Sequence, residues 1–169
     1  MSAALRRPLA LAAALAVGAC GYSFRSPVPA HLDTVYVPTF ENETREFLLT
    51  QALTERVISE FQNESRLRIA GGESGADLVV RGTIVSYSEE ALSYEPGQAV
   101  TPDVFSRRVV ITVDVRLMDQ VRDETLWENP SLSQWGEFNE EQGETVETGI
   151  ERAIEKIGEE ILRNVAEEF

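Results

Sequence analysis

The stretch of sequence that decides the fold runs from residue 107 to residue 118 and reads RRVVITVDVRLM. Every second residue from position 109 is a branched apolar one, namely Val109, Ile111, Val113, Val115 and Leu117. Because successive side chains of a strand point to opposite faces of its sheet, this alternation predicts a strand with one apolar face. The other face is dominated by Arg108, Thr112, Asp114 and Arg116. An apolar sheet face needs a second layer to cover it.

Two amphipathic helices are predicted to form that layer. The first should run from about Arg45 to Gln62, because apolar residues recur every four positions at Leu49, Leu53, Val57 and Phe61, and Leu48, Ala52 and Ile58 widen the stripe. The second should run from Glu144 to about Glu167. Its apolar side consists of Val146, Ile150, Ile154, Ile157, Ile161 and Val165.

Further strands are predicted at 34–40, 66–70 and 78–87, and one broken strand or two short ones at 125–138. Pro38 has no N–H to give to a sheet, so we place it at an edge or at the end of its strand. Residues 88–106 are predicted to form a long loop. The fold class that follows is α+β: a two-layer sandwich with both helices on one face of a mainly antiparallel sheet of about four strands.

The first twenty residues are typical of a secretory signal that ends in a cysteine. Arg6 and Arg7 precede an apolar run at 9–17, which is too short to span a bilayer. The small residues Gly18 and Ala19 then lead to Cys20, a layout that resembles the lipobox of bacterial lipoproteins. We therefore expect cleavage between Ala19 and Cys20, which gives a signal peptide at 1–19, a lipidated tether at 20–33 and a domain at 34–169. The alternative is a secreted protein with a chance cysteine at this place.

Lipidation of Cys20 predicts a protein that is anchored to a membrane and does not cross it. Several acyl chains together make attachment effectively permanent, because each buried methylene contributes about 0.8 kcal/mol. Bacterial lipoproteins that stay at the inner membrane commonly carry aspartate after the cysteine, whereas this chain has Gly21. The sequence thus resembles outer-membrane lipoproteins, with the domain on the periplasmic side; the alternative is the cell surface.

The charge balance argues against nucleic acid as a partner. The chain has 15 basic and 29 acidic residues, and loss of Arg6 and Arg7 with the signal leaves 13 basic residues and a net charge of −16. Nucleic acids and anionic headgroups both require clustered positive charge. Cys20 is the only cysteine, so we expect packing, and no disulfide, to hold the domain together.

The residues do not predict an enzyme. The single histidine, His31, falls in the predicted tether, where we expect a solvated side chain. Cys20 is used by the lipid, and one His with one Cys cannot close a zinc site, so neither a metal nor a cofactor is expected. Acidic pairs such as Glu89-Glu90 are typical of solvated surfaces.

Arginines are the candidate contact residues. If the helices cover one side of the sheet, Arg108 and Arg116 lie on the open side, and the strand at 78–87 adds Arg81 to a face shared with Val79, Val85 and Tyr87. Guanidinium groups suit phosphate and carboxylate ligands. The alternative is that they pair with neighbouring acids such as Asp114.

Several segments, taken in order, resemble the LptE family of lipopolysaccharide-assembly lipoproteins. They are CGYSF from Cys20, VYVPTFEN from Val35, ADLVVRGTI from Ala76, the strand that begins at Arg108, Leu126-Trp127 and the acidic last helix. The resemblance implies an outer-membrane lipoprotein with two helices on a four-stranded sheet. It would plug the lipopolysaccharide translocon barrel, help to assemble it and contact lipopolysaccharide. Candidate contacts are Arg81, Arg107, Arg108 and Arg116.

A different lipoprotein function is the alternative. Residues 40–44, the helix after them and Ala76-Asp77 also resemble lipoproteins that activate peptidoglycan synthases and those that build curli pores. The partner would then be a cell-wall synthase, or other copies of the chain. Those proteins tend to have more helix after the second strand, whereas this chain continues through a loop to the strand at 107–118.

Overall fold

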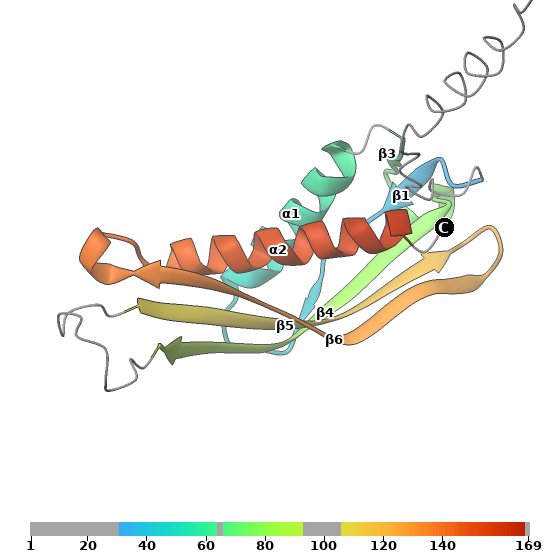
Figure 1. Cartoon of the computed structure of the whole chain (residues 1–169). Coiled ribbons are helices and arrows are strands. Elements are labelled where there is room, and N and C mark those ends of the chain that lie inside the picture. The colour runs from blue at the N-terminus through green and yellow to red at the C-terminus, as the bar shows by residue number, and fades with distance from the viewer. Residues whose placement is uncertain (1–30, 64–65, 93–105, 168–169) are drawn as a thin grey trace, which may run out of the picture.

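The computed structural model describes residues 31–63, 66–92 and 106–167. In chain order the elements are β1 (Thr34–Tyr36), β2 (Glu41–Asn42), α1 (Leu48–Asn63), β3 (Arg68–Ile69), the 3-10 turn η2 (Glu73–Gly75), β4 (Leu78–Ala91), β5 (Ser106–Asp119), β6 (Glu124–Asn139), the 3-10 turn η3 (Glu140–Gln142) and α2 (Val146–Glu167). They form the expected two layers of helices and sheet (Figure 1).

The sheet has six strands and is mixed, which corrects the expectation of about four mainly antiparallel ones. Its order is β3-β1-β4-β5-β6, with β2 also paired to β4. The long strands β4, β5 and β6 are antiparallel, whereas β1, β2 and β3 pair in parallel. The chain passes from β1 through α1 to β3, and such a crossover brings it back to run in the same direction. Strands of two or three residues are too short to show a period of two.

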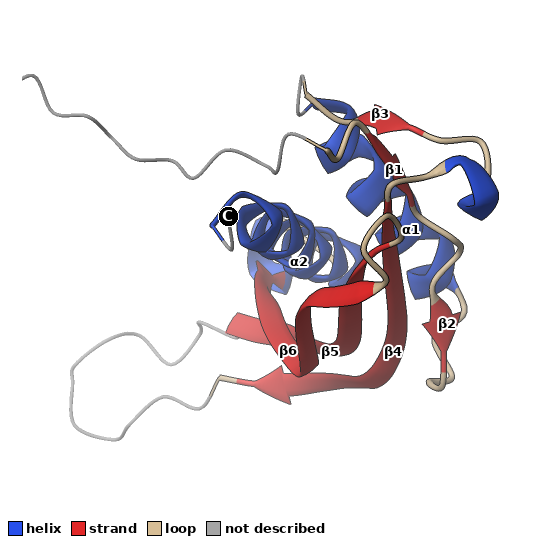
Figure 2. Ribbon diagram, turned by 90° about the vertical axis from the view of Figure 1, so that its right-hand side faces the viewer, coloured by secondary structure: helices blue, strands red, loops and turns tan. Residues whose placement is uncertain are grey.

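Both helices lie on one side of the sheet, as predicted, and enclose a single apolar core (Figures 1 and 2). The alternating residues of β5 are buried, which confirms the strand at 107–118. Leu49, Leu53, Val57 and Phe61 of α1 are buried as well. Leu48 and Ala52 are not part of this stripe: Ala52 is exposed and Leu48 is 70% exposed. Among the described residues, no helix has the length and apolar character required to cross a membrane.

Two glycines allow α2 to contact β6 directly. A Cβ on Gly136 of β6 would lie 1.9 Å from the carbonyl oxygen of Gly149 in α2 and 2.8 Å from the backbone nitrogen of Ala153. Gly82 of β4 is covered in a similar way, because the ring of Phe40 occupies the place of a side chain there, 2.1 Å from the position of a Cβ. The Phe40 N–H also donates to Thr54 Oγ1 of α1 at 3.0 Å.

The strand β6 is continuous through Pro130 and forms the last strand of the sheet order. A register shift opposite Val113 and Val115 accommodates the proline, which is tolerated on an edge strand. Two cations of α2 donate to backbone carbonyls of β6: Arg152 Nη1 to Glu137 O at 2.6 Å and Lys156 Nζ to Trp135 O at 2.7 Å. Basic side chains of the second layer therefore cover part of this edge.

The residues just before β1 belong to the fold. Leu32 is fully buried, and His31 Nε2 lies 2.5 Å from Asp119 Oδ2, with the Asp119 side chain fully buried. The expectation of a solvated His31 is therefore wrong. Burial alone would raise the pKa of Asp119, but hydrogen bonds from His31 and from the Arg122 and Val121 N–H groups lower it overall. The sequence gives no signal of this pair, because its members are 88 residues apart.

Candidate interaction surfaces

A β-bulge in β4 decides which side chains reach the outward face, the side of the sheet away from the helices. The register of β4 and β5 shifts between Ile84 and Ser86, so that Tyr87 lies opposite the buried Ile111. Tyr87 packs at the border of the core, and our expectation that it shares a face with Arg81 is wrong. Burial, and then the hydrogen bond from the Tyr87 hydroxyl to Glu89, raise the pKa of Tyr87.

The same register separates the four candidate arginines. Arg81 and Arg116 are directly opposite each other, and Arg108 pairs with Glu90 further along the outward face. Together with Asp114, Arg81 and Arg116 line a shallow hollow of about 160 Å³. Arg107 is in register with Phe138 on the inward side, and its guanidinium lies 5.6 Å from the centre of that ring. The structure thus brings three of the four arginines to one face.

Each of the four guanidinium groups already has a carboxylate partner. Arg107 contacts Glu89 and Glu140, both at 2.9 Å, Arg108 contacts Glu90 at 2.5 Å, Arg116 contacts Glu128 at 3.3 Å, and Arg81 contacts Glu73. The hydrogen bond to Glu140 is the main reason why the pKa of Arg107 is raised. This arrangement agrees with the acid-pairing alternative, although the partners are glutamates and not Asp114. Local positive charge is therefore largely cancelled.

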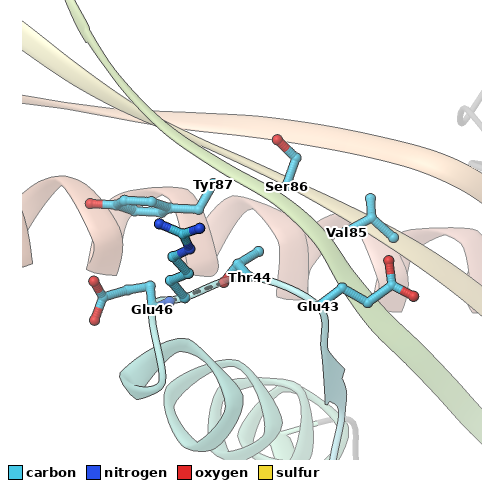
Figure 3. Close-up of a pocket in the computed structure, with 7 residues that line it drawn as sticks. Glu43, Thr44, Glu46, Val85, Ser86 and Tyr87 are labelled. Atoms are coloured by element: carbon cyan, nitrogen blue, oxygen red, sulfur yellow. Dashed lines mark hydrogen bonds between the residues drawn. The ribbon is translucent and has the colours of Figure 1, made fainter.

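A second surface lies where the chain enters α1. A hollow of about 460 Å³ separates the segment 43–46 from residues 85–87 of β4 (Figure 3). The figure shows Tyr87, Ser86 and Val85 on one side of it, and Glu43, Thr44 and Glu46 on the other. The alternation of β4 predicts Val85 and Tyr87 on the same face as Arg81 and gives no sign that they meet the segment 43–46, because the bulge leaves no mark in that alternation.

The described residues contain no group of three or more His, Cys, Asp or Glu side chains that could hold a metal ion. The predicted cleavage and lipidation residues, Ala19 and Cys20, lie outside the part of the chain that the structure describes.

Several solved structures have a similar fold. Uncharacterized lipoprotein B from Nitrosomonas europaea is 18% identical, with a TM-score of 0.52 over 86% of this chain and 90% of that one. A hypothetical protein from Chlamydia trachomatis is 13% identical, with a TM-score of 0.54 over 79% of this chain and 98% of that one. The dodecamer of a single-residue variant of PelC from Paraburkholderia phytofirmans is 15% identical, with a TM-score of 0.50 over 83% of this chain and 91% of that one. These likenesses concern the fold alone.

Comparison with curated proteins gave no match. The model of the LptE family, described as lipopolysaccharide-assembly, matches residues 32–167. The match begins at the buried Leu32 and ends at the last residue of α2, and so includes both layers of the sandwich. The chain therefore belongs to the LptE family of lipopolysaccharide-assembly proteins.

Proposed function

We propose that this protein is an outer-membrane lipoprotein of the lipopolysaccharide transport machinery, which plugs the translocon barrel and helps to assemble it. It acts by binding and not as an enzyme. Family membership over residues 32–167 is the observation that carries the proposal. The anchor is the lipid on Cys20, after removal of residues 1–19, and the domain faces the periplasm and the barrel lumen.

The surface of the domain suits a barrel interior. The lumen of outer-membrane barrels is polar, so a plug must be hydrophilic on the sides that face the wall. The outward face of β4, β5 and β6 is mainly polar, because its middle rows carry Thr83, Ser86, Thr112 and Ser133, with ion pairs at either end. Val110 and the exposed Trp135 add one apolar row to it. The glycine contact between α2 and β6 favours a rigid domain that keeps its shape during docking.

Contact with lipopolysaccharide is a secondary role in this proposal. The hollow between Arg81 and Arg116 is its candidate site, with Arg107 and Arg108 nearer the other end of β5. A phosphate group would have to displace a glutamate from each guanidinium, and these pairs are partly exposed, which keeps that cost low. The charge of −16 on the lipidated chain opposes an anionic ligand, so we assign the principal role to the barrel.

The test is recovery of the partner from detergent-solubilised outer membranes. We expect the tagged, full-length protein to co-purify with a translocon barrel in a one-to-one ratio. Recovery of a peptidoglycan synthase without a barrel would instead support the alternative function. Recovery of a large assembly of copies without a barrel would favour a pore formed by self-association; PelC, whose fold is similar, forms a dodecamer.

The anchor is tested by replacing Cys20 with serine. We expect the Cys20→Ser product to keep its signal peptide or to be released from the membrane, because no acyl chain is then attached. Mass spectrometry of the wild-type protein should show an acylated Cys20 at the N-terminus. An unmodified thiol at that position would contradict the proposed anchor without affecting the family assignment.

A further inference from the structure

The segment that enters α1 presents two large apolar side chains to solvent. Phe47 is 84% exposed and Leu48 is 70% exposed, the highest values among the large hydrophobic residues of the described chain. They are adjacent in sequence, and Ala52, one turn later on α1, is exposed as well. Exposed apolar residues that gather in one place are a common mark of a protein-binding surface.

Two hollows border this segment. The hollow of about 460 Å³ described above borders the segment at 43–46. A second hollow, of about 370 Å³, is lined by Phe47 itself together with Thr39, Thr50, Gln51, Thr54 and Glu55. The segment 43–48, called the ridge below, therefore borders two depressions that an opposing surface can fill.

The ridge is held in one conformation. Asn42 Oδ1 accepts hydrogen bonds from the Thr44 N–H at 2.8 Å and the Thr44 hydroxyl at 2.7 Å, and Asn42 Nδ2 donates to Glu46 O at 2.9 Å. The Glu43 N–H donates to Ile84 O of β4 at 2.9 Å, which fixes the segment to the sheet. Binding through such a segment loses little conformational entropy, because the segment is already ordered.

The charge around the ridge indicates the chemistry of its partner. Glu41, Glu43 and Glu46 flank the apolar pair, and none of these three carboxylates has an ion-pair partner within the described residues. The carboxylates beside the arginines of β4 and β5 are, by contrast, neutralised. Arg45 is the one cation in the segment 41–48. A binding surface with an apolar centre and a negative border calls for an apolar recess with a basic border.

We propose that Phe47 and Leu48 form the centre of the docking surface for the partner protein, and that they enter an apolar recess bordered by Lys or Arg residues. This inference rests on the proposed function, since it takes the partner to be the translocon barrel. It assigns the barrel contact to the entry of α1 and not to the arginines of the sheet.

The first experiment is co-purification of the barrel with full-length variants. The double variant Phe47→Ala/Leu48→Ala should recover at least tenfold less barrel than the wild type, because large anchors at the centre of an interface carry most of the binding energy. The matched control is Val121→Ala, which truncates an apolar side chain that is 59% exposed in the turn between β5 and β6. The control should recover the barrel within twofold of the wild type.

A second pair of variants tests the basic border. Glu43→Lys/Glu46→Lys should lower recovery of the barrel at low salt, whereas Glu43→Gln/Glu46→Gln should make recovery less sensitive to added salt. Unchanged thermal unfolding would show that each variant is folded. Glu43 and Glu46, like Phe47 and Leu48, are at least partly exposed, so we expect none of these substitutions to lower the stability of the domain.

A photoreactive residue at position 47 identifies the occupant directly. A crosslink to the barrel supports the proposal, and a crosslink to a second copy of the chain or to lipid overturns it. If the wild type recovers the barrel and Phe47→Ala/Leu48→Ala recovers it equally well, the docking surface is wrong and the proposed function stands. If the wild type recovers no barrel, the proposed function fails together with the docking surface.

Discussion

Replacement of Gly136 by alanine should destabilise the domain strongly, although it adds only one methyl group. The new Cβ would lie 1.9 Å from Gly149 O, 2.8 Å from Ala153 N and 2.8 Å from Arg152 Cβ. Two of these atoms are backbone atoms of α2, which cannot rotate away as a side chain can. Ordinary contact begins at 3.4 Å, so α2 would have to retreat from β6 by about 1.5 Å. Overpacking of this kind costs about 3 kcal/mol.

Urea denaturation followed by circular dichroism measures this cost. With a slope of about 2 kcal/mol per molar urea, a loss of about 3 kcal/mol lowers the midpoint by about 1.5 M. Gly71→Ala is the matched control, because a Cβ there meets nothing within 4 Å, and we expect its midpoint to stay within about 0.5 M of the wild type. A Gly136→Ala midpoint equal to that of the wild type would refute the close approach of α2 to β6.

Three further perturbations test the core, the buried acid and the ion pairs. Leu53→Ala should lower the free energy of unfolding by about 2–5 kcal/mol, because Leu53 is fully buried. Leu48→Ala on the same helix should change it by less than about 0.5 kcal/mol, because Leu48 is exposed. Equal effects would contradict the orientation of α1. Asp119→Asn should cost about 1–3 kcal/mol at pH 7. The lowered pKa of Asp119 stabilises the fold above about pH 4, the pKa of an unfolded aspartate, and this stability is lost as the pH falls through the native pKa. Urea titrations at several pH values should therefore show that the free energies of unfolding of the wild type and of Asp119→Asn converge in acid. A difference that stays constant with pH would argue against the lowered pKa. Arg116→Ala should cost less than about 1 kcal/mol in thermal unfolding, since the pair with Glu128 is half exposed, and a larger loss would mean that the pair is more important than its geometry indicates.

The sequence was sufficient for the elements whose residues repeat. The alternation at 109–117 predicted β5 and its buried face, and the four-residue spacing from Leu49 to Phe61 predicted α1 and its packing side. Both succeed because one buried face imposes a period that depends only on local geometry. The start of α1 differs from the prediction, because the helix begins at Leu48 and not at Arg45. Leu48 continues the apolar pattern of the helix, yet its side chain is exposed.

Features that depend on contacts between distant segments could not be predicted. The parallel pairing of β1 with β3 and β4 requires knowledge of where α1 brings the chain back. The bulge between Ile84 and Ser86 changes which side of the sheet Tyr87 occupies, and none of the residues 84–86 is a proline or a glycine that would indicate it. The glutamate partners of the arginines could not be predicted for the same reason, because the neighbours of a residue across strands follow from the register of the sheet.

The coverage of β6 by α2 affects how readily copies of this protein associate with one another. An uncovered outer strand is a template onto which a strand of another chain can be added, and repetition of that event leads to fibrils. In β6 the carbonyls of Trp135 and Glu137 already accept hydrogen bonds from Lys156 and Arg152. Pro130 has no N–H to donate to an added strand. At high protein concentration we therefore expect that no strand of another copy adds to the edge of β6, and that the copies remain separate and folded.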